Sequence, residues 1–172
     1  EQDDNGYNPR TEWDNVTTMV CFHKRYNLGD KHGYNSNYYD GWNELKKQIE
    51  EDYNVFMIKP LYLYDHSGIT ISTSPFGCMW DSGQVGWIFV SKQKVETDCG
   101  KDCNVEEVLK GEVETYDQYL TGDVYGYVVS KVDVCDKSCE HKEEVHSCWG
   151  YYGEEECMSE AKSILEYELE KV

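Results

Sequence analysis

The stretch VFMIKPLYLY (residues 55–64), followed by DHSG (65–68) and ITIST (69–73), decides the fold. The first segment is apolar and aromatic, the last alternates at period two, and the four residues between them are turn formers, so together they predict a β-hairpin. Pro60 removes a ladder donor and marks an edge or a bulge in the first strand. Because GWIFV (residues 86–90) predicts a further strand, we expect residues 55–90 to form a meander of three antiparallel strands.

The segments on either side of this meander complete the fold prediction. VTTMVCF (residues 16–22) is β-branched and apolar, which predicts a buried strand. Helical spacing of apolar residues predicts helices over residues 40–52, 104–121 and 154–172, and residues 124–134 and 145–152 predict a second hairpin around an acidic loop. The resulting class is α+β: a mainly antiparallel sheet with about three helices packed on one face, in a single domain.

Length and composition set the domain organisation. A chain of 172 residues is long enough for one core, and 15 tyrosines with 5 tryptophans exceed what a disordered acidic chain carries. Residues 1–12 are polar and predict a loose N-terminal arm, followed by a single α+β domain over residues 13–172 with an acidic C-terminal half. No apolar run approaches the roughly 18 residues of a membrane span. We therefore expect a cytoplasmic protein that has no membrane partner.

The net charge of −18 is unevenly distributed along the chain. Residues 96–172 hold 21 acidic against 7 basic residues, whereas residues 1–95 hold 13 against 9. Such a surface repels nucleic acid and attracts a basic groove. Eighteen charges match roughly 30 Å of duplex, which favours a nucleic-acid mimic over direct nucleic-acid binding. The predicted partner-binding residues are the acids of the helix over 104–121, with tyrosines and tryptophans as anchors: Glu106, Glu107, Glu114 and Asp117. The alternative is a solvated face that keeps the protein soluble.

Two polar segments offer an enzymatic alternative. Asp65 or Asp81 is able to orient His66 beside Ser67 or Ser82, which is the minimal arrangement of a nucleophile and its base. This pattern predicts a hydrolase site around Asp65, His66 and Asp81. Both segments also fall at predicted turns, where aspartate, serine and glycine are expected for their backbone geometry.

Six of the eight cysteines lie in the acidic half. Cys99 and Cys103 repeat the four-residue step of Cys135 and Cys139, so these four thiols form a weak alternative zinc site. Each pair has three intervening residues, where the usual zinc knuckle has two. Disulfides and free reduced thiols are the competing interpretations, and we expect no cofactor.

Several stretches together resemble a known family: DNVTTMVCFH (14–23), YNLGD (26–30), LYLYDHSG (61–68), WDSGQVG (80–86), ETYDQYLTGDVYG (114–126) and SCWGYYG (147–153). This family consists of small acidic proteins carried by phages, plasmids and integrative elements of Firmicutes, mostly without assigned function. The resemblance supplies no catalytic residue. It implies a mobile-element context, in the cytoplasm of a host bacterial cell, in which small acidic proteins often block host defences. The first hypothesis is thus a non-enzymatic inhibitor, of anti-CRISPR or antirestriction type, that occupies the basic nucleic-acid groove of a host defence nuclease.

Overall fold

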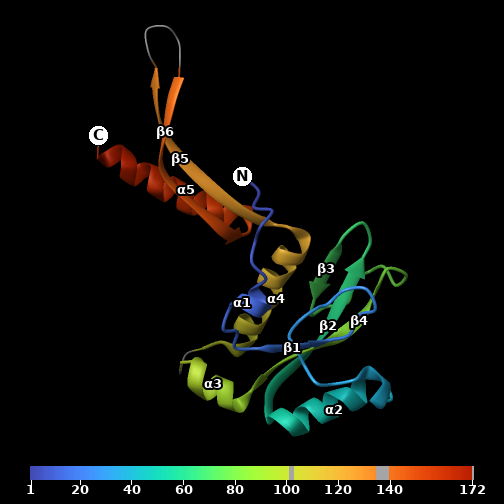
Figure 1. Cartoon of the computed structure of the whole chain (residues 1–172). Helices are drawn as coiled ribbons and strands as arrows, with labels where there is room; N and C mark the ends of the chain where they lie inside the picture. The colour runs from blue at the N-terminus through green and yellow to red at the C-terminus, as the bar shows by residue number, and fades with distance from the viewer. Residues whose placement is uncertain (101–102, 135–139, 172) are drawn as a thin grey trace. The chain divides into compact units, whose positions relative to one another are not determined.

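The computed structural model describes residues 1–100, 103–134 and 140–171 (Figure 1). The chain is divided into two compact units. We call Asn8–Thr121 the sheet unit, and Glu1–Tyr7 together with Gly122–Val172 the ribbon unit. The fold class is α+β with antiparallel sheets, as the sequence predicted. The described residues hold five α-helices and one 3-10 helix, more than the predicted three.

The sheet unit is built on four antiparallel strands: β1 (Thr18–Cys21), β2 (Val55–Asp65), β3 (Ile69–Ser72) and β4 (Ser82–Ser91). Their order is β1-β4-β2-β3. The β2–β3 hairpin is confirmed, but β4 pairs with β2 on the side away from β3, so the predicted meander is wrong. Residues 85–90 of β4 are buried without interruption. An uninterrupted apolar run belongs in a central strand covered on both faces, and this explains why β4 lies inside the sheet.

Helices cover both faces of this sheet, so the expectation that they pack on one face is wrong. The helix α4 (Val105–Thr121) packs against one face and α2 (Trp42–Tyr53) against the other. Side chains alternate between the two faces along each strand. The core on the α4 side includes Met19, Leu61, Leu63, Ile88, Leu109, Val113 and Tyr116. The core on the α2 side comprises Val20, Leu45, Ile49, Trp87 and Phe89.

The ribbon unit consists of the hairpin β5 (Val124–Val134) and β6 (Glu140–Tyr152), packed against α5 (Glu154–Glu170). The strand β6 begins five residues before the predicted start at residue 145. The N-terminal residues lie along β5, where the N–H of Asp3 donates to the carbonyl of Val124 at 2.7 Å. The buried side chains of this unit include Val124, Tyr127, Tyr152 and Cys157.

Three short helices were not predicted. They are α1 (Pro9–Glu12), η1 (Ser36–Tyr38) and α3 (Lys92–Asp98), and each begins after a side chain that accepts a backbone N–H: Asn8, Asn35 and Ser91. Such caps stabilise helices too short for an apolar stripe to show in the sequence. Within the described residues, no helix is both long and apolar enough to cross a membrane.

Candidate functional site

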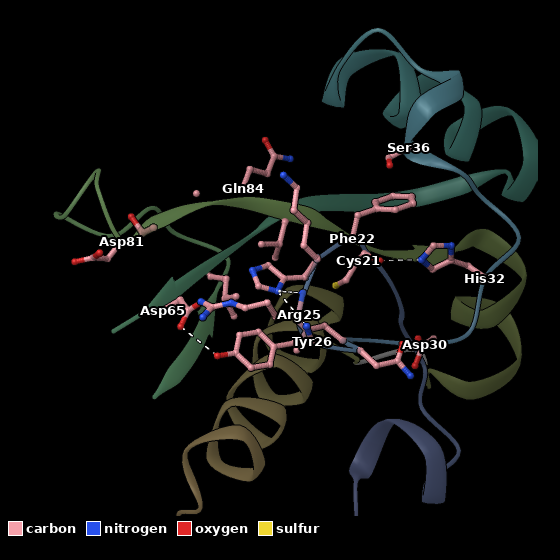
Figure 2. A pocket seen from close by; sticks show the side chains of 18 of the residues that line it. Cys21, Phe22, Arg25, Tyr26, Asp30, His32, Ser36, Asp65, Asp81 and Gln84 are labelled. Atoms are coloured by element: carbon pink, nitrogen blue, oxygen red, sulfur yellow. Dashed lines mark hydrogen bonds and ion pairs between the residues drawn. The ribbon is translucent and has the colours of Figure 1, made fainter. Parts of the chain in front are cut away.

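The sheet unit contains an open cleft with a volume of about 1080 Å³ (Figure 2). One wall is the segment of residues 21–32 that follows β1, and the other comes from the end of β2 and the start of β4. In this view Asp65 and Asp81 lie at one end, and His32 and Ser36 lie at the other. The volume lies just above the usual range of about 300–1,000 Å³ for small-molecule sites.

Contacts with β1 and α4 fix the first wall of the cleft. Gly29 adopts a φ of +69°, and its N–H donates to the hydroxyl of Tyr116 at 2.9 Å. A Cβ at this glycine would lie 2.7 Å from the carbonyl oxygen of Met19, so the chain approaches β1 too closely for a side chain. Asp30 then returns to β1, where it accepts the N–H of Met19 at 2.7 Å and pairs with the buried Arg10.

The wall segment is cationic, although the chain as a whole is acidic. Lys24, Arg25 and Lys31 line the cleft, as do His23 and His32. The guanidinium of Arg25 pairs with Asp65. The hydroxyl of Tyr26 donates to the same carboxylate at 3.3 Å, as Figure 2 shows.

The structure places the residues of the alternative hydrolase site in two groups. Nδ1 of His66 lies 3.3 Å from Oδ2 of Asp81, so these two side chains are together, with 62% of the His66 side chain exposed. Asp65 is engaged by Arg25 and Tyr26 instead. The hydroxyl of Ser82 donates to the carbonyl of Cys78, which directs it away from a nucleophile's role. The enzymatic alternative stays a prediction.

The acids predicted to bind a partner lie on α4 and differ in their surroundings. Glu106 pairs with Lys59 at 2.6 Å, which lowers the pKa of Glu106, and Glu114 pairs with Lys110 at 3.4 Å. Asp117 accepts the hydroxyl of Thr70 and the N–H of Ile71, so it anchors β3. Glu107 is exposed. Two of the four are therefore balanced by lysines, and one is structural.

A denser acidic surface lies in the ribbon unit, which carries 16 acidic and 5 basic residues, a net charge of −11. Within α5 there are seven glutamates and one lysine. Six of these glutamates are exposed: Glu154, Glu155, Glu156, Glu160, Glu166 and Glu170. Exposed apolar side chains occur in the same unit: Val128, Val132, Trp149, Leu165, Tyr167 and Leu169.

The cysteines of the weak zinc alternative are only partly described. The thiols of Cys99 and Cys103 are hydrogen-bonded, and this contact, with burial, raises the pKa of Cys99 to about 11. Cys135 and Cys139 lie outside the described residues. Among the residues that the structure describes, no three His, Cys, Asp or Glu side chains are grouped to hold a metal ion.

Cys21 lines the cleft, but its thiol is protected. Burial, together with the charge of Asp30, raises the pKa of Cys21 to about 12. At about pH 8 its thiolate fraction is on the order of a thousandfold below that of an ordinary cysteine. We expect iodoacetamide to leave Cys21 unmodified in the folded protein and to alkylate it after denaturation, as measured by peptide mass spectrometry. Labelling of Cys21 as fast as the partly exposed Cys78 would contradict this.

Sequence reasoning missed the cationic wall of the cleft. The available signal was the cluster of Lys24, Arg25, Lys31 and two histidines within ten residues of an acidic chain. That residues 80–85 form the opposite wall of the cleft could be predicted only from the order of the strands in the sheet. Comparison with known proteins adds no family, because no protein-family model, curated protein or solved structure matches the chain.

Proposed function

We propose that the protein is a non-enzymatic inhibitor that occupies the basic nucleic-acid groove of a host defence nuclease, of CRISPR-effector or restriction type. The observation that carries the proposal is the group of six exposed glutamates on α5 within a unit of net charge −11. The sequence resemblance to acidic proteins of mobile elements supports the choice of a defence nuclease as partner.

The spacing of the charges favours mimicry of a nucleic-acid strand. A helix of 17 residues is about 25 Å long, so six glutamates average roughly one charge per 4 Å, against about 3.4 Å along one DNA strand, with a gap of about 9 Å between Glu160 and Glu166. Glu156 and Glu160 lie one turn apart, as do Glu166 and Glu170. A groove that binds successive phosphates accepts carboxylates at similar intervals. For this reason we assign docking to α5 rather than to the partly neutralised acids of α4.

Exposed apolar side chains of the ribbon unit are candidates for the hydrophobic contacts that bind the partner. Trp149 is 47% exposed and Tyr167 is 57% exposed, although both are large aromatic residues. Buried aromatic anchors carry much of the affinity of protein interfaces, whereas surrounding charges set the association rate. We therefore expect fast, salt-sensitive association through α5, followed by burial of aromatic side chains of the ribbon unit.

A charge-matched pair of triple variants tests the proposal. The changes Glu156→Gln, Glu160→Gln and Glu166→Gln are expected to weaken inhibition of the target by about tenfold or more and to flatten its dependence on ionic strength. The control carries the same charge change in the sheet unit: Glu12→Gln, Glu51→Gln and Glu96→Gln. The measurement is DNA cleavage by purified CRISPR effectors and restriction enzymes across an ionic-strength series. Equal inhibition by the two triple variants would exclude docking through α5.

A further inference from the structure

The cleft of the sheet unit combines lysines that have no ion-pair partner with carboxylates that already contact basic side chains. Its three acids each contact a basic side chain: Asp30 shares Arg10 with Glu112, Asp65 pairs with Arg25, and Asp81 lies 3.3 Å from Nδ1 of His66. Lys24 and Lys31 are exposed at the cleft and make no ion pair with any described residue. The cleft thus presents two ammonium groups that no described carboxylate contacts, in a protein whose net charge is −18.

The imidazole of His23 adds a neutral donor to the same wall. Its Nδ1 accepts the backbone N–H groups of Arg25 at 3.3 Å and Tyr26 at 3.2 Å. A ring nitrogen that accepts two hydrogen bonds carries no proton, so the proton of the neutral ring is on Nε2. Stacking on Tyr26, with ring centroids 4.9 Å apart, holds this orientation. His23 is therefore set to donate from Nε2 to an oxygen.

A further observation points to an organic ligand rather than a bare ion. Trp80 lines the cleft with 96% of its surface exposed, so its indole offers a face for a planar ring. In the described chain, the buried Nδ1 of His32 has no hydrogen-bond partner, while Nε2 lies 3.0 Å from the carbonyl oxygen of Cys21. Because a carbonyl oxygen only accepts, Nε2 carries the proton; Nδ1 is closed to solvent, so His32 fixes this end of the cleft and offers no acceptor to a ligand.

We propose that this cleft binds a nucleoside monophosphate. Lys24, Lys31 and the Nε2–H of His23 hold the phosphate, because ammonium and imidazole donors form strong charge-assisted hydrogen bonds with phosphate oxygens. The indole of Trp80 covers the base. The volume of about 1080 Å³ accommodates a ligand of this size. This site belongs to the sheet unit alone and does not depend on docking through α5.

Calorimetric titration with AMP, adenosine and inorganic phosphate measures how much the nucleoside and the phosphate each contribute to affinity. We expect saturable binding of AMP, with adenosine and phosphate each binding more weakly. The double variant Lys24→Gln with Lys31→Gln is expected to weaken AMP binding by about tenfold or more, and Trp80→Ala to weaken AMP and adenosine but not phosphate. All three side chains are exposed, so circular dichroism is expected to show an unchanged fold.

The matched control is Lys47→Gln with Lys92→Gln, which removes two exposed lysines of the same unit that do not line the cleft. It is expected to bind AMP as the parent protein does. The proposal is overturned if none of AMP, GMP, CMP and UMP binds at millimolar concentration, or if the two double variants lose affinity equally. Binding of phosphate as tight as that of AMP would exclude a nucleotide as the ligand class.

Discussion

Replacing Arg10 with methionine is expected to lower the free energy of unfolding by about 3–5 kcal/mol. The Arg10 side chain is 1% exposed and joins two elements through their carboxylates. It pairs with Asp30 at 2.5 Å and with Glu112 at 2.8 Å, and also donates to the carbonyl of Thr17 at 2.8 Å. Methionine fills much of the volume but leaves both carboxylates without their cation.

The environment of Arg10 supports a large effect. Burial alone would lower the pKa of Arg10, yet the pKa is raised because the carboxylates of Asp30 and Glu112 more than offset desolvation. Both carboxylates also accept backbone N–H groups of the segment around β1, from Val16 and Met19. Loss of the guanidinium would therefore loosen the segment that forms the wall of the cleft, not a single contact.

The same substitution at Arg25 is the control. Arg25 also pairs with an aspartate, Asp65, but its side chain is 67% exposed. Exposed pairs contribute little, and we expect Arg25→Met to cost less than about 1 kcal/mol. The measurement is urea unfolding of both variants, followed by circular dichroism. If Arg10→Met lowers the free energy of unfolding no more than Arg25→Met does, the ion pairs of Arg10 with Asp30 and Glu112 do not stabilise the fold.

Most of the secondary structure of this protein could be predicted from local patterns. The β2–β3 hairpin follows from alternation around residues 65–68, and α4 follows from an apolar stripe with Asn104 at its start. The strand order could not be predicted in this way, because a local pattern does not indicate which strand is the hydrogen-bonded neighbour. The clue was the unbroken apolar run of β4, which identifies a strand covered on both faces rather than the last strand of a meander.

The cleft was harder to predict than the fold for the same reason. Asp65, His66 and Asp81 were identified by residue type, and the structure places His66 beside Asp81 because β2 and β4 are neighbours. The engagement of Asp65 by Arg25 depends on a loop 40 residues earlier in the chain. Local sequence patterns do not predict a contact between residues that are 40 positions apart in the chain. Charge composition did identify the acidic half, but could not distinguish the paired acids of α4 from the exposed acids of α5.

The second large effect is expected at Gly86, where alanine should destabilise the sheet unit by about 3 kcal/mol or more. Gly86 lies in β4 opposite Cys21 of β1 and Leu61 of β2. A Cβ at this position would lie 2.1 Å from the carbonyl oxygen of Val20 and 2.9 Å from the Cα of Cys21. Both neighbours are backbone, so no side-chain rotation relieves the clash, and β1 must move away from β4.

Gly83 offers the matched control three residues earlier on β4. A Cβ there meets nothing within 4 Å, so alanine is expected to change the free energy of unfolding by no more than about 1 kcal/mol and to favour folding, because glycine loses more backbone entropy. Hydrogen exchange of the β1 amides measures the local effect: faster exchange is expected in Gly86→Ala and unchanged exchange in Gly83→Ala. Since β1 leads directly into the cationic wall, loss of its pairing should also weaken AMP binding. Equal protection of β1 in the two variants would mean that the close approach of β1 and β4 is not required for the fold.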